Sequence, residues 1–233
     1  MIIGSWINIK NKIFENGFKI FIVCLIITTL AAGTNIVKEI TSNESILKII
    51  PFIYAILFMF AVKTSLNLYE KKFRVRKTFF INPLLVINYI LAFVVWAFAV
   101  SGAYIFFRFG ETKLYTIGAL IYLTILIVKI LPMFFYVLDE DKRYNPIKAF
   151  VKSILDTNRN TIKILFFLIM NLLLIVPVYM MKDILSDMVY NYIGEVQNFI
   201  IAKSFIIGFL DSLIFVFAAI NLSYLYKTIS IKK

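Results

Sequence analysis

Residues 81–107 read INPLLVINYILAFVVWAFAVSGAYIFF, a run of 27 residues without a charged side chain. A helix of about 20 consecutive apolar residues crosses the hydrocarbon core of a bilayer. No water is available there, so the backbone N–H and C=O groups must find partners within the segment, as they do in a helix. This stretch therefore predicts a transmembrane helix.

Five further stretches have a similar length and apolar character: 20–37, 49–69, 114–138, 164–181 and 204–226. Hydrophobic residues make up 61 % of the chain, where about 45–50 % is usual in soluble domains. A globule of this length has too little interior to bury that excess, whereas lipid solvates it. We expect a single integral membrane domain over residues 1–233, an all-α polytopic membrane helix bundle of about six transmembrane helices.

The first apolar run also has features of a secretory signal peptide. Lysines precede it, and small residues stand at positions 31–33. The run is as long as a membrane span, however, and five more apolar runs follow it. We therefore expect it to be retained as the first span.

The distribution of basic residues predicts the orientation, because Lys and Arg are enriched in cytoplasmic loops. Of the 25 Lys and Arg residues, 18 lie in the two termini and in segments 63–77 and 142–163. The connections on the other side of the expected spans hold 6. We expect a multi-pass cell-membrane protein with its N-terminus and C-terminus in the cytoplasm. The net charge of +12 arises from this asymmetry, so the charge does not call for a nucleic-acid partner.

Three connecting segments show helical periodicity with one apolar face: 1–18, 145–157 and 189–200. We expect each to be an interfacial amphipathic helix outside the spans. Such a helix lies with its apolar face in lipid or docks on a partner protein, and the sequence is compatible with both.

Segment 145–157 shows the pattern most clearly. Asn145 suits the N-cap position and Pro146 the first turn, while Lys148 and Lys152 fall on the polar side. The apolar positions follow the i, i+3, i+4, i+7, i+8 spacing: Ile147, Phe150, Val151, Ile154 and Leu155. This segment is the better candidate for docking, because it is basic and directly joins two spans.

Lys129 and Asp211 are charges inside the fourth and sixth apolar stretches. Ionisable residues within a membrane are costly and often functional. At 1.5 Å per residue their depths differ by roughly 9 Å, near the combined reach of the two side chains. We expect an intramembrane ion pair that holds two helices together. The alternatives are that Asp211 faces a polar cavity or the outer interface, or that the two residues serve transport or a proton relay.

Residues that carry common enzyme chemistry are scarce. The chain has no histidine and one cysteine, Cys24, so the commonest general base and metal ligand is missing and no internal disulfide can form. It contains no phosphate-binding loop, nucleophile elbow or H-E-x-x-H motif. The acidic run Asp139-Glu140-Asp141 offers oxygen ligands for a cation, but its basic neighbours favour a solvated helix end. We expect no enzyme, no cofactor and no metal site.

A resemblance rests on residues 132–176, which read PMFFYVLDEDKRYNPIKAFVKSILDTNRNTIKILFFLIMNLLLIV. A proline late in a span is followed by a Tyr, an edge Asp and an amphipathic helix with an Ala and a Ser: Pro132, Tyr136, Asp139, Pro146, Ala149 and Ser153. The pattern resembles a group of bacterial six-helix membrane proteins of mostly unknown function. The group includes the membrane domain attached to some glycerophosphoryl diester phosphodiesterases.

The resemblance implies a fold rather than an activity, because the chain holds no phosphodiesterase catalytic domain. The link before the fifth span usually contains a glycine in that group, whereas here it reads Thr157-Asn158-Arg159-Asn160. The match covers about a fifth of the chain.

Two functional hypotheses follow, and a lipid-modifying membrane enzyme is a less favoured third. The first is a non-catalytic subunit or scaffold of a membrane complex, which would contact the bilayer and another membrane or cytoplasmic protein. The second is a permease-type transport protein, either the membrane subunit of an ABC-type transporter or a self-protection protein.

Overall fold

A computed structural model describes residues 10–41, 43–68, 73–109, 113–140, 144–158, 160–193 and 196–230. Across these ranges the backbone forms helices joined by short links, with no β-strand. The chain forms two compact units. Unit 1 comprises Met1–Phe80 and Ile169–Tyr224, and unit 2 comprises Ile81–Leu168 and Leu225–Lys233.

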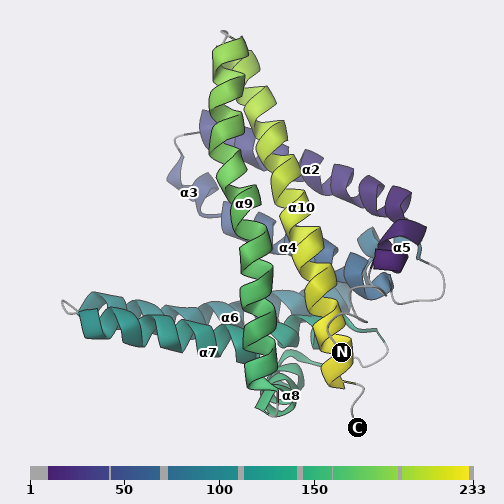
Figure 1. The fold of residues 1–233 in the computed structure, drawn as a ribbon, viewed down its shortest axis with the longest axis vertical. Helices are drawn as coiled ribbons and strands as arrows, with labels where there is room; N and C mark the ends of the chain where they lie inside the picture. The colour runs from purple at the N-terminus through teal and green to yellow at the C-terminus, as the bar shows by residue number, and fades with distance from the viewer. Residues whose placement is uncertain are drawn as a thin grey trace. The chain divides into compact units, whose positions relative to one another are not determined.

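The helices are shown in Figure 1, and residues 10–15 are also helical. In chain order they are α2 (Gly17–Ile40), α3 (Glu44–Leu47), α4 (Ile50–Asn67), α5 (Val75–Phe79), α6 (Pro83–Phe109), α7 (Lys113–Leu138), α8 (Pro146–Asn158), α9 (Thr161–Ile193) and α10 (Val196–Ser230).

Among the residues that the structure describes, five helical segments are long and apolar enough to cross a membrane: Gly17–Ile40, Glu44–Asn67, Pro83–Gly102, Tyr115–Leu138 and Asn198–Ile229. They overlap five of the six expected spans, so the all-α class is confirmed and the helices suit a multi-pass membrane protein. The remaining expected span, 164–181, falls within α9 and stays a prediction.

Residues 189–200, expected to form one interfacial helix, contribute to two helices, and their place at the membrane interface stays a prediction. Its first residues form the end of α9, and residues from Val196 onward form the start of α10. An apolar stripe on a helix is compatible with an interfacial segment and with the extension of a span beyond the apolar core. Periodicity alone did not separate these two cases.

Two helices begin at an Asn-Pro pair. The side-chain oxygen of Asn82 accepts a hydrogen bond from the backbone N–H of Leu84 (2.9 Å) at the start of α6. Asn145 accepts one from the N–H of Lys148 (2.8 Å) at the start of α8. A proline in the first turn removes no helical hydrogen bond, because the first N–H groups have no intrahelical partner. The N-cap predicted at Asn145 is confirmed.

Small residues bring α2 and α10 close together in unit 1. A Cβ atom on Gly208 would lie 2.9 Å from the carbonyl oxygen of Thr28 and 2.9 Å from the backbone nitrogen of Ala32. One turn further along α10, the hydroxyl of Ser212 lies 2.9 Å from that of Thr28. Small side chains allow membrane helices to approach at backbone distance, and hydroxyl pairs add hydrogen bonds there.

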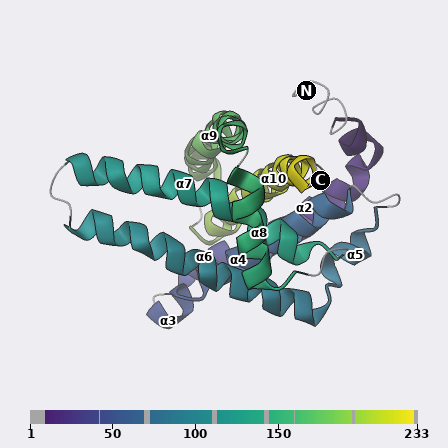
Figure 2. The ribbon, with the colours of Figure 1, turned by 90° about the horizontal axis from the view of Figure 1, so that it is seen from below.

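Aromatic side chains fill the contact between α6 and α7 in unit 2, which run side by side in Figures 1 and 2. The ring of Phe134 lies 5.4 Å from that of Tyr89 and 6.5 Å from that of Trp96. The hydroxyl of Tyr122 donates to the carbonyl of Ala99 (3.0 Å), so its polar end is satisfied within the helix pair.

Replacing Gly208 with Ala should lower the melting temperature by several degrees, because overpacking a close contact costs about 1–3 kcal/mol. Gly33 on α2 is the matched control, since a Cβ atom there meets nothing within 4 Å. Gly33→Ala should leave the melting temperature unchanged or raise it slightly, as alanine favours a helix. Thermal unfolding in mild detergent measures both. Equal melting temperatures for the two variants would contradict the close approach of α2 and α10.

Candidate functional site

Helix α8 packs through a face of small residues. Pro146, Ala149, Ser153 and Thr157 are its buried positions, spaced three and four residues apart on one side of the helix. Its packing partners in unit 2 are α7 and α6. Short side chains on this face let the α8 backbone lie close to α7.

The apolar positions predicted from periodicity lie outside this packing face. Ile147, Val151 and Leu155 are 74 %, 49 % and 60 % exposed. Phe150 and Ile154 are half-buried at its edges. We refer to these five residues as the α8 stripe. The stripe is an exposed apolar surface on a helix whose opposite side is already packed.

A hydroxyl of α8 bonds to the backbone of α7. The side chain of Ser153 donates to the carbonyl oxygen of Lys129. Pro132, inside α7, lacks an N–H, so the carbonyl of Val128 four residues earlier loses its helical donor, and the Lys129 carbonyl lies next to it. Neighbouring hydroxyl groups commonly complete such interrupted stretches in membrane helices.

The side chain of Lys129 reaches the link between α8 and α9. Its ammonium group donates to Asn158 Oδ1 (2.8 Å) and to Thr161 Oγ1 (2.9 Å), the last residue of α8 and the first of α9. The Thr161 hydroxyl in turn donates to the carbonyl of Thr157 (3.0 Å). Lys129 thus fastens α7 to the end of α8.

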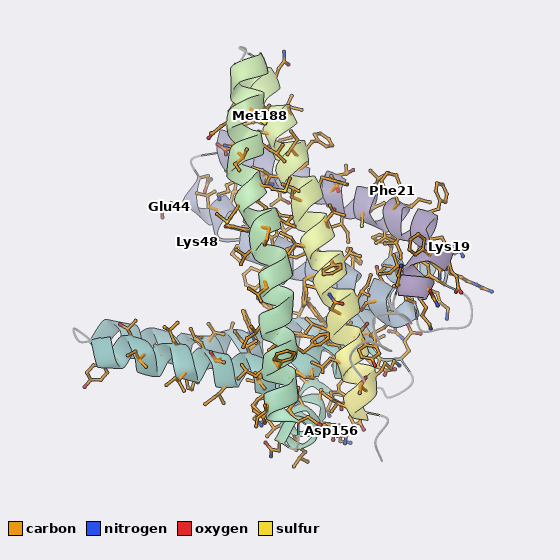
Figure 3. The ribbon with its side chains drawn as sticks, viewed as in Figure 1. Lys19, Phe21, Glu44, Lys48, Asp156 and Met188 are labelled. Atoms are coloured by element: carbon orange, nitrogen blue, oxygen red, sulfur yellow. The ribbon has the colours of Figure 1, made fainter. Side chains whose placement is uncertain are left out.

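Asp156 forms the third connection between the two helices and is labelled in Figure 3. It accepts a hydrogen bond from the hydroxyl of Tyr136 on α7. It also pairs with Lys152 one turn earlier on α8, at 2.6 Å. Lys152, expected on the polar side of the helix, lies in this partly buried polar cluster.

Asp139 is buried at the end of α7. Tyr226 of α10 donates to its carboxylate at 2.7 Å, and Lys227 lies 3.6 Å away. The rings of Tyr226 and Tyr136 meet edge to face, with centroids 4.8 Å apart. The sequence predicted that Asp139 belongs to a solvated helix end. That prediction is wrong, because aromatic side chains cover its carboxylate. Asp141 lies outside the described residues.

Asp211 pairs with Lys182 in unit 1. Its carboxylate accepts from the Lys182 ammonium group, and both side chains are largely buried. The Lys182 nitrogen also lies 4.8 Å from the centre of the Tyr179 ring. Asp211 and Lys129 belong to different compact units, and the pair expected between them stays a prediction.

Lys129, Lys152, Asp139 and Asp156 at the α7–α8 junction each have a polar partner. Such an arrangement fixes the geometry of two helices. Among the residues that the structure describes, no group of three or more acidic or cysteine side chains could hold a metal ion. Within the described part of this junction, the α8 stripe is an exposed apolar surface.

Comparison with known proteins found no matching family model, no similar curated protein and no similar solved structure. The relation to the membrane domains of phosphodiesterases stays a prediction. The six positions on which that resemblance rests are buried at the α7–α8 junction: Pro132, Tyr136, Asp139, Pro146, Ala149 and Ser153.

Lys182 and Asp211 should show strong energetic coupling. Lys182→Met leaves the Asp211 carboxylate without its ionic partner, and Asp211→Asn does the same to the Lys182 ammonium group. An unpaired charge in a largely buried site lowers the stability of the fold. Each single variant should therefore lower the melting temperature in detergent. The double variant should recover most of that loss, because it leaves neither charge alone. Additive losses would contradict the pair.

A second cycle with Lys129→Met and Asp211→Asn tests the pair expected from the sequence. Recovery of stability in that double variant would support it. Additive losses would restrict Lys129 to its partners at the end of α8.

Proposed function

We propose that the protein is a non-catalytic subunit or scaffold of a membrane complex, and that the α8 stripe is its docking surface. The partner is another membrane or cytoplasmic protein. The observation that carries the proposal is the division of α8 into a small-residue face packed on α7 and an exposed apolar face.

The way in which α8 is attached supports docking on a protein. A helix that only rests in lipid needs no rigid connection to its neighbours. Here α8 is held to α7 by the Ser153 hydroxyl, the Asp156 carboxylate and the Asn158 side chain. Binding to a surface that is already ordered loses less conformational entropy, which favours affinity and specificity.

In the same proposal the chain crosses the cell membrane six times and has both termini in the cytoplasm, so α8 lies on the cytoplasmic side. The excess of Lys and Arg in the termini and in segments 63–77 and 142–163 supports this orientation. The resemblance to bacterial six-helix membrane proteins supports a membrane domain without its own catalytic site.

A permease-type transport protein is the second candidate. The observation that favours it is the ion pair of Lys182 and Asp211 between two largely apolar helices, because ionisable residues in spans often line transport paths. In an ABC-type arrangement the chain would co-purify with a separate ATPase in a fixed ratio.

Affinity purification in mild detergent tests the docking surface. Wild-type protein should retain a second chain in a fixed ratio, and Leu155→Asp should reduce its recovery at least tenfold, a loss of about 1.4 kcal/mol or more. Leu155 is 60 % exposed, so the substitution leaves the packing on α7 intact. Ile154 is less suitable because it is half-buried.

Lys148→Gln is the matched control, since Lys148 is exposed on α8 outside the stripe and should retain the partner. Lys152 is unsuitable as a control, because it pairs with Asp156. An unaltered ratio in Leu155→Asp, or a wild-type chain that purifies alone, would contradict docking through the stripe. An ATPase as the second chain would favour the transport candidate.

A further inference from the structure

A second exposed surface lies in unit 1, where the helical segment 10–15 leads into α2. Phe14 and Phe18 are 76 % and 77 % exposed, and Phe21 continues the same face at helical spacing. Phe80, directly after α5, is 74 % exposed. Large aromatic side chains left uncovered at the start of an apolar helix mark contact with a membrane interface or a partner.

Two lysines hold this segment against the end of α4. The ammonium group of Lys12 donates to the carbonyl of Leu68 (3.2 Å), the C-cap of α4, and that of Lys19 donates to the carbonyl of Phe73 (3.2 Å). The bond from Lys12 satisfies the C-cap carbonyl of α4, where a cation is also favoured by the helix dipole. Phe73 lies directly before Arg74, the N-cap of α5, so the bond from Lys19 attaches the segment to the start of that helix. Residues 10–19 and 73–80 therefore form one surface within unit 1, and Figure 3 labels Lys19, which belongs to it, and Phe21, which follows it on α2.

The surface is strongly cationic. Glu15 is its single acidic residue, against six basic ones: Lys10, Lys12, Lys19, Arg74, Arg76 and Lys77. The guanidinium group of Arg76 lies 5.0 Å from the centre of the Phe80 ring, and the Lys10 nitrogen lies 5.9 Å from that of Phe14. On this surface, basic groups and exposed aromatic rings thus lie close to one another.

The chemistry of an anionic phospholipid matches both features. Aromatic rings prefer the boundary between acyl chains and headgroups, and basic groups beside a span bind negatively charged headgroups. A lipid with no net charge would match the rings but leave the excess of positive charge unbalanced. A soluble acidic partner would match the charge but leave the aromatic face, which runs onto α2, without an apolar cover.

We propose that residues 10–19 and 73–80 form a binding surface for the headgroups of anionic phospholipids. The aromatic side chains enter the interfacial region, and Lys10, Arg74 and Arg76 contact headgroup phosphates. This surface belongs to unit 1 and is separate from the α8 stripe of unit 2, so it is independent of the proposed docking function.

Thermal unfolding of the full chain in mixed micelles tests the proposal. Added phosphatidylglycerol should raise the melting temperature more than an equal amount of phosphatidylcholine. The double variant Arg74→Gln and Arg76→Gln should lose at least half of that difference, and both side chains are exposed, so the fold should be retained. Moderate salt should reduce the effect, because exposed charges are screened. Lys10→Gln, also on an exposed side chain, provides a second variant.

The matched control is the double variant Lys38→Gln and Lys48→Gln, which removes the same charge from exposed positions at the opposite end of the first two expected spans. It should keep the full preference for phosphatidylglycerol. Equal shifts with the two lipids would overturn the proposal. So would an equal loss in both double variants, which would indicate a general effect of net charge. An equal shift with inorganic phosphate would also overturn it, because the surface would then recognise the free anion.

Discussion

The hydroxyl of Ser153 donates a hydrogen bond to the backbone carbonyl of Lys129, and the position of α8 depends on this contact. The acceptor lies three residues before Pro132, which removes one helical hydrogen bond from α7, the bond to the carbonyl of Val128. The bond from Ser153 requires the backbones to be close, which the small residues Ala149 and Thr157 permit. With that side of α8 occupied, its large apolar side chains point away from α7 and remain exposed.

The features that the sequence predicted well are those set by local physics. Apolar stretches of sufficient length predicted the helices that suit a membrane, because lipid leaves the backbone few alternatives. Asn145 and Pro146 predicted the start of α8, since capping involves only neighbouring residues. The spacing of Ile147, Val151 and Leu155 predicted one apolar face, and these side chains do share one side of the helix.

The features that it did not predict depend on contacts between distant segments. Depth along a span did not predict the contacts that Lys129 and Asp211 make within their own units, because depth does not report which helices are neighbours or how each is rotated. Lys129 reaches Asn158 because α8 folds back on α7, and Asp211 meets Lys182 because α9 and α10 pack together. Asp139 is buried for the same reason, since Tyr226 comes from the far end of the chain.

Spin labels placed singly along α8 test the central claim, that this helix lies on the cytoplasmic side with its small face packed and its stripe outward. The chain would carry Cys24→Ala and be studied alone in vesicles that expose the extracytoplasmic face. The account predicts high oxygen accessibility at positions 151 and 155, low accessibility at 149, and protection of all three from an impermeant reductant added outside. Equal oxygen accessibility at all three positions, or rapid reduction from the outside, would contradict it.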